Sequence, residues 1–79
     1  NPFQEYTRIG FVMPKRGVAT LEVYDLSGKL VYQHQGEFPQ GYHELELSST
    51  LLPAHGLYMY RLAAEDFSTT RKLIFSVGR

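Results

Sequence analysis

Six short segments of this chain alternate apolar and polar residues with a period of two, and this pattern most constrains its fold. The clearest run is Tyr42–Leu47, where a histidine and two leucines alternate with two glutamates. Successive side chains of a β-strand point to opposite faces of a sheet, so each segment predicts a strand that is buried on one face. The other five segments are Thr7–Met13, Thr20–Asp25, Lys29–Gln35, Leu57–Ala63 and Thr69–Val77.

Residues typical of turns separate the six segments. The tight breaks are Pro14-Lys15-Arg16-Gly17, Asp25-Leu26-Ser27-Gly28 and Glu65-Asp66-Phe67, and the wider ones are Gly36–Gly41 and Ser48–Gly56. Glycine adopts a positive φ without strain, so Gly28 suits the end of its turn. No segment shows the period of an amphipathic helix over three turns. Short strands at this spacing predict an all-β, immunoglobulin-like antiparallel β-sandwich of six to seven strands, with the seventh around Phe3–Tyr6.

The apolar parity of these strands is expected to form the core of the sandwich. In Thr7–Met13, for example, Ile9 and Phe11 lie on one side, whereas Arg8 and Gly10 lie on the other. Residues of one parity face the same way, so the apolar sets of different strands can meet between two sheets. The predicted core comprises Ile9, Phe11, Leu21, Val23, Leu45, Leu47, Leu73 and Phe75.

Length and composition predict one small domain, residues 1–79, without the marks of a nucleic-acid or membrane protein. Hydrophobic residues make up 43% of the chain, too many for a disordered segment. Eight basic residues balance eight acidic ones without a run of like charge, whereas nucleic-acid binders and membrane-surface modules usually cluster Lys and Arg. No apolar run approaches the ~18 residues that span a bilayer. Because the chain starts at Asn1 without a methionine or signal peptide, we expect it to be a segment of a longer protein.

No group of residues has the pattern of a catalytic centre, a cofactor site or a metal site. The absence of cysteine excludes disulfides, Cys-ligated zinc and thiol catalysis. His34, His43 and His55 fall in three different segments, and His43 is expected to be a partly covered strand residue. Asp25 and Ser27 lack the further oxygen ligands of a calcium loop, and no serine has a G-x-S-x-G context. We therefore expect no enzymatic activity, no cofactor and no metal.

The tyrosines of Leu57–Ala63 leave two interpretations open. Tyr58 and Tyr60 share one face of this strand with Leu62, and the other face carries Leu57, Met59 and Arg61. Exposed aromatic rings can stack on sugars, as in a carbohydrate-binding module. The interpretation that we favour assigns both tyrosines to the core and rim of a small sandwich.

Six motifs in order make nearly the whole chain resemble the C-terminal sorting domain family of the type IX secretion system (Por secretion system). They are Asn1-Pro2-Phe3, Ile9-Gly10-Phe11-Val12-Met13-Pro14, the hairpin from Leu21 to Val31, Gly41-Tyr42-His43, the segment from Leu52 to Tyr58, and Thr70-Arg71-Lys72-Leu73-Ile74-Phe75. The immunoglobulin-like domain of flagellar hook-capping proteins shares the opening and the first hairpin. That group usually carries a tryptophan- and glycine-rich stretch where this chain has Leu47–Pro53. His55 departs from the sorting family, in which a small residue is more usual.

The resemblance implies a secretion signal at the end of a larger exported protein of the Bacteroidota. The translocon recognises such a domain on the periplasmic side, with shuttle proteins, and a surface sortase usually cleaves it. The cargo then stays on the cell surface or is released. The implied partners are these secretion proteins, with no nucleic acid and no membrane insertion, and the domain is expected to be a monomer. The alternative function is a carbohydrate-binding or spacer β-sandwich appended to a secreted hydrolase.

The motif positions implied in recognition or folding are Gly41, Gly56, Tyr58, Lys72 and Ile74. We expect Gly56 and Tyr58 to hold the fold, with the Tyr58 hydroxyl bonded to the backbone of the Ser48–His55 loop. Lys72 has the opposite parity to Leu73 and Phe75, so we expect it to face solvent. A lysine in solvent adds little stability, and this assigns Lys72 to the surface that the translocon recognises.

Overall fold

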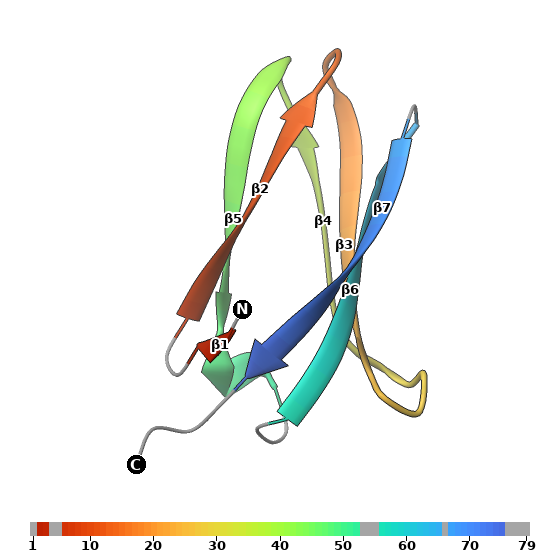
Figure 1. The fold of residues 1–79 in the computed structure, drawn as a ribbon. Coiled ribbons are helices and arrows are strands. Elements are labelled where there is room, and N and C mark those ends of the chain that lie inside the picture. Colours follow the sequence, from red (N-terminus) through yellow and green to blue (C-terminus); the bar gives the residue numbers. More distant parts are fainter. Residues whose placement is uncertain (1, 4–5, 53–55, 66, 76–79) are drawn as a thin grey trace.

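The computed structural model describes residues 2–3, 6–52, 56–65 and 67–75, with side chains for 6–52, 56–65 and 67–69, and these form two sheets packed face to face (Figure 1). The larger sheet has the order β1-β7-β6-β3-β4 and contains β1 (Pro2–Phe3), β3 (Gly17–Asp25), β4 (Leu30–Phe38), β6 (Gly56–Ala64) and β7 (Phe67–Phe75). The smaller sheet contains β2 (Tyr6–Met13) and β5 (Gly41–Ser48), and a 3-10 helix, η1 (Ser49–Leu51), follows β5. Every strand pair is antiparallel except β1 with β7. The predicted antiparallel β-sandwich is confirmed.

One predicted break is wrong, because β4 continues through Gly36 to Phe38 and only Pro39 and Gln40 separate it from β5. Gly36 pairs with Ala19 of β3, so its backbone stays in the sheet. Proline cannot donate a ladder hydrogen bond, and the strand ends at Phe38, directly before Pro39. Gly36 therefore lies inside the strand, and Pro39, not Gly36, indicates where the strand ends.

A shift in strand register explains why β4 begins with three consecutive apolar residues. Tyr32 pairs with Val23, but the next pair along β3 is Tyr24 with Leu30. Val31 is left without a partner residue on β3, as happens at a β-bulge. The extra residue interrupts the alternation of inward and outward side chains, so parity alone assigns this stretch poorly.

The core lies between the sheets and contains most of the predicted residues. Ile9, Phe11, Leu21, Val23 and Leu47 are buried as predicted, and Met13, Ala19, Leu52, Tyr58 and Leu62 join them. The prediction for Leu45 was too strong, because Leu45 is only partly buried and packs against the edge of this core. Its position is at the flank of the two-stranded sheet, where no third strand covers it in the described part of the chain. The side chains of Leu73 and Phe75 lie outside the described residues.

The turn from Asp25 to Gly28 between β3 and β4 has the predicted form. The N–H of Gly28 donates to the carbonyl of Asp25 at 3.0 Å, and Gly28 has φ +89°. One carboxylate oxygen of Asp25 accepts from the Ser27 hydroxyl at 2.7 Å, the Ser27 N–H at 2.9 Å and the Lys29 N–H at 3.0 Å. These bonds, led by that of the Ser27 hydroxyl, lower the pKa of Asp25. The ionised carboxylate therefore stabilises the turn.

Candidate recognition surface

Two large apolar side chains, Leu57 and Met59, lie in solvent on the outer face of the larger sheet. Strand β6 alternates, so Tyr58 and Leu62 point into the core while Leu57 and Met59 are 41% and 43% exposed. Leu57 and Met59 lie two residues apart, on the same face of one strand. Large exposed apolar residues that stand together on a sheet are typical of interaction surfaces. We call Leu57, Met59 and the paired positions on β7 the β6–β7 face.

The strand register brings two of the predicted site positions to this face. Met59 pairs with Lys72, and Leu57 pairs with Ile74. Residues directly opposite each other in an antiparallel pair share a face of the sheet. The side chains of Lys72 and Ile74 lie outside the described residues, so their contacts stay a prediction. At the level of the backbone, four residues from two strands meet at adjacent positions.

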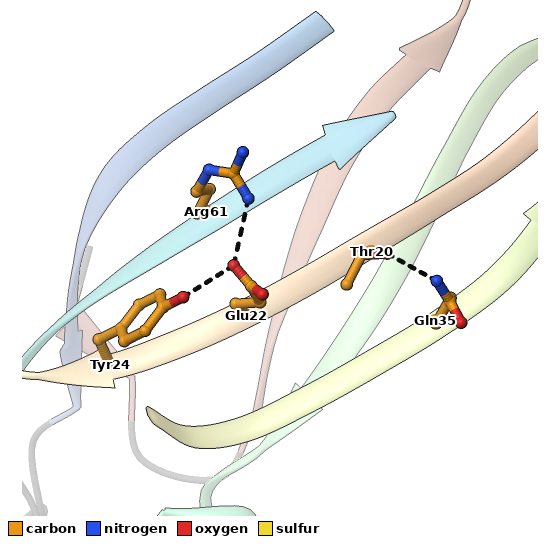
Figure 2. Close-up of polar contacts among 5 residues, drawn as sticks. All are labelled: Thr20, Glu22, Tyr24, Gln35 and Arg61. Atoms are coloured by element: carbon orange, nitrogen blue, oxygen red, sulfur yellow. Dashed lines mark hydrogen bonds and ion pairs between the residues drawn. The ribbon is translucent and has the colours of Figure 1, made fainter. Parts of the chain in front are cut away.

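Figure 2 shows a polar cluster centred on Glu22, and the strand register places this cluster beside the apolar pair. The Tyr24 hydroxyl donates to Oε1 of Glu22 at 2.8 Å, and Nη1 of Arg61 donates to the same oxygen at 3.2 Å. Tyr24 pairs with Met59 across β3 and β6, so the cluster adjoins the β6–β7 face directly. The hydrogen bond to Glu22 raises the pKa of the Tyr24 hydroxyl. The three side chains thus form a fixed, locally neutral border beside the exposed leucine and methionine.

Toward β4 the same outer face carries paired polar groups, beside Val18 of β3, which is 50% exposed. Nε2 of Gln35 donates to Oγ1 of Thr20 at 3.2 Å, which links the outer sides of β3 and β4 (Figure 2). Farther along this end of the sheet, Glu37 and Arg16 lie 3.6 Å apart as an exposed ion pair. Paired polar groups have less need of a partner than exposed apolar ones. Val18 lies opposite Glu37 among these polar groups, whereas Leu57 and Met59 lie together on one strand, so the part of the face over β6 is the better candidate for binding.

The other predicted site residues do not belong to this surface. Gly41 begins β5 with φ +119°, and Gly56 begins β6 with φ +149°, which are backbone shapes that favour glycine. A β-carbon at either glycine would meet no atom within 4 Å, so the constraint is the backbone and not a neighbour. Tyr58 is 4% exposed and faces the core. The partner predicted for its hydroxyl, in the loop that ends at His55, stays a prediction because residues 53–55 are outside the described residues.

Sequence reasoning placed Leu57, Met59 and Arg61 on one face of their strand but did not identify them as part of a site. The available signal was the presence of two large apolar residues at the parity opposite to the buried tyrosine. Glu22 and Tyr24 also carried a signal, because residues two apart on a strand share a face. The pairing of Met59 with Lys72 depends on the exact hairpin register, which alternation alone does not fix.

The inward direction of the tyrosines bears on the carbohydrate interpretation. Tyr58 is buried and Tyr60 is partly buried against the core. Sugar stacking needs an exposed ring face, so these two tyrosines fit the core-and-rim assignment instead.

The described histidines have structural surroundings. His43 lies 5.1 Å from Phe38 and 5.7 Å from Phe11 between ring centroids, and its Nε2 is 2.7 Å from the carbonyl oxygen of Pro39. His43 is partly buried, as predicted, and His34 lies exposed on β4, while His55 is outside the described residues. In the described ranges, no three His, Cys, Asp or Glu side chains gather where they could hold a metal ion. None of the helical segments among the described residues is long and apolar enough to cross a membrane.

Comparison with known proteins identifies the family to which the chain belongs. The family model described as secretion system C-terminal sorting domain matches residues 1–76 of the 79-residue chain. The match therefore includes the seven strands of the described residues, among them both strands of the β6–β7 face. No curated protein and no solved structure matches the chain.

Proposed function

Because this chain belongs to the family of secretion system C-terminal sorting domains, it is a sorting signal of type IX secretion, and we propose that the translocon recognises its folded sandwich. The family works with the type IX system and directs export toward the cell surface, and it is not a catalytic family. The match over residues 1–76 is the observation that carries the proposal.

The finer steps follow from the same proposal. The domain is one folded unit, residues 1–79, at the end of a larger exported protein, and it acts as a monomer. The translocon recognises it in the periplasm, shuttle proteins deliver it, and a surface sortase cleaves it after passage. In these steps the domain functions through its surface.

We propose the β6–β7 face as the surface that the translocon recognises. Leu57 and Met59 offer apolar area that is already in solvent, so a partner gains free energy by covering it. Lys72 and Ile74 hold the paired backbone positions on β7, so the proposed surface includes both positions. The Glu22 cluster beside the face is held by hydrogen bonds and has no net charge, so it adds no electrostatic repulsion toward a charged partner.

The sorting function is tested by fusing residues 1–79 to the C-terminus of a periplasmic reporter in a type IX-competent host. Surface and medium recovery of the reporter is compared between the competent strain and a translocon-deficient strain. We expect recovery only from the competent strain, with the reporter retained in the periplasm of the deficient one. Equal recovery from both strains would contradict the proposed function.

A further inference from the structure

Strand β5 has a free edge that is suited to pairing with another strand. In the described part of the chain, β5 pairs with β2 alone and β2 pairs with β5 alone. Alternate residues of β5 therefore direct N–H and C=O groups away from β2 without a ladder partner. Residues Gly41–Ser48 contain neither proline nor lysine, two common means by which proteins block such an edge.

A groove runs along this edge, between the two sheets. One hollow of about 160 Å³ is lined by Leu21, Tyr32 and His34 of the larger sheet and by Leu45 and Glu46 of β5. A second, more open hollow of about 360 Å³ is lined by Lys29–Val31 and Thr50–Leu52. Both are bounded by β4 on one side and by β5 or the turn after it on the other. The groove occupies the position that a third strand of the smaller sheet would take.

Among the described residues, aromatic side chains close one end of this flank. Phe11 and Phe38 meet edge to face with ring centroids 5.2 Å apart, and His43 packs on both rings. Toward the other end, Leu45 is only partly buried, and Leu30 and Leu51 are 44% and 41% exposed. A strand beside β5 would place every second side chain over these apolar residues. The inward residues of the missing strand should therefore be apolar.

The charges on β5 indicate which residues a third strand should carry on its outer side. Glu44 and Glu46 lie on the outer side of β5. The guanidinium of Arg8 on β2 forms an ion pair with each, at 4.0 Å to Glu44 and 3.8 Å to Glu46. One arginine cannot neutralise two carboxylates, so the edge keeps a net negative charge. If two copies of β5 paired antiparallel around Leu45, Glu44 of each would face Glu46 of the other, and like charges opposite each other destabilise a sheet. The edge therefore disfavours a second copy and favours a basic strand.

We propose that the free edge of β5 accepts an extended segment of a different protein, in which apolar residues alternate with lysine or arginine. The segment adds a third strand to the smaller sheet through main-chain hydrogen bonds. Its apolar residues enter the groove above Leu45, and its basic residues lie opposite Glu44 and Glu46. This surface is on the other sheet from the β6–β7 face, and the inference does not depend on which face the translocon recognises.

The probe is a peptide of about nine residues, close to the length of β5, in which valine alternates with lysine. Amide chemical shifts of the 79-residue chain are followed during titration with this peptide. Two isomers carry N-methyl groups on the valines or on the lysines, because only one set of amides faces β5 in a paired strand. We expect shifts along Gly41–Ser48 with the parent peptide, and binding by one methylated isomer but not by the other.

Charge is tested with the double variant Glu44→Lys/Glu46→Lys against the matched control Glu37→Lys/Glu65→Lys. We expect the first to weaken peptide binding about tenfold or more and the control to bind as the wild type does. If Glu44→Lys/Glu46→Lys does not fold, the comparison of methylated isomers on the wild-type chain still decides. Equal binding by the two isomers, or shifts centred on Leu57 and Met59, would overturn the proposal. Concentration-dependent shifts of β5 without peptide would assign the edge to a second copy and would also overturn it.

Discussion

The ring of Tyr42 lies across Gly10 of the neighbouring strand, where a β-carbon added at Gly10 would clash with the Tyr42 hydroxyl and lie 3.0 Å from Cζ. The two residues are diagonal neighbours, since Gly10 pairs with Glu44 and Val12 pairs with Tyr42. The hydroxyl of Tyr42 donates to Oε2 of Glu44 at 2.9 Å, which holds the ring in place. An aromatic ring that covers a glycine in this way compensates for the missing side chain.

This contact predicts coupling between the two positions. Alanine in a strand is about 0.5–1 kcal/mol more favourable than glycine when it fits, so Gly10→Ala should stabilise the Tyr42→Ala variant by about that amount. In the wild type, Gly10→Ala displaces the ring, and the gain should vanish or reverse. Urea unfolding of the two single variants and the double variant gives the coupling energy. Additive effects would mean that Tyr42 does not use the space over Gly10.

Burial separates two leucines that have the same parity on β5. Leu47 is fully buried, so Leu47→Ala should lower the free energy of unfolding by about 2–5 kcal/mol. Leu45 borders the open groove, so Leu45→Ala should cost only about 1–2 kcal/mol, because part of this side chain is already in solvent. Denaturant unfolding of both variants measures the difference. A larger loss for Leu45→Ala would show that the flank is closed in solution.

The Asp25 turn predicts a pH dependence of stability. Hydrogen bonds from Ser27 and Lys29 hold the pKa of Asp25 below its value of 3.8 in an unfolded chain. A carboxyl group with a lowered folded pKa stabilises the protein above about pH 4 and loses this effect as the pH falls through the folded pKa. Asp25→Ala should therefore be less stable than the wild type near neutral pH, and the gap should close in strong acid. Thermal unfolding of the wild type and Asp25→Ala, near neutral pH and in strong acid, measures the difference in stability.

A matched variant separates charge from hydrogen bonding in this turn. Asp25→Asn keeps one oxygen acceptor but cannot titrate, so it should be more stable than Asp25→Ala. The difference between these two variants should be the same at every pH. A gap between wild type and Asp25→Ala that does not change with pH would contradict the assigned role of the carboxylate.

The roles of Tyr58 and Lys72 predict different phenotypes. Tyr58→Phe removes a hydroxyl from a buried tyrosine and should cost about 1 kcal/mol of stability, with any loss of secretion following that loss. Lys72→Ala should leave the melting temperature nearly unchanged and reduce secretion of a fused reporter. Lys29→Ala, in the turn between β3 and β4, is the matched control. Normal secretion of Lys72→Ala would contradict its place on the recognised surface.

Strand parity was sufficient to predict the sandwich, because burial of one face imposes the alternation directly. It also predicted five of the buried core positions, Ile9, Phe11, Leu21, Val23 and Leu47. It failed at Gly36 and Val31, where a glycine stayed in the ladder and a bulge shifted the register. The alternation within one strand does not specify which strands share a sheet. The open groove beside Leu45 follows from a two-stranded sheet facing a five-stranded one, so it could not be predicted from parity.

The candidate surface was predictable only in part, for the same reason. The parity of Lys72 in its strand was visible in the sequence, and so was the shared face of Leu57 and Met59. Their meeting is set by the register of the β6–β7 hairpin, in which Ala64 pairs with Phe67 and Met59 with Lys72. A shift of one residue would have moved every β7 side chain to the other face.

Reporter export by the double variant Leu57→Ser/Met59→Ser tests recognition through the β6–β7 face most directly. Both side chains are exposed, so the variant should keep its melting temperature within a few degrees of the wild type. Val12→Ser, which removes a 60% exposed apolar residue from the other sheet, is the control. We predict that the double variant accumulates in the periplasm of the competent host, whereas Val12→Ser reaches the surface as the wild type does. Export of the double variant at the wild-type level, with its fold intact, would contradict recognition through this face.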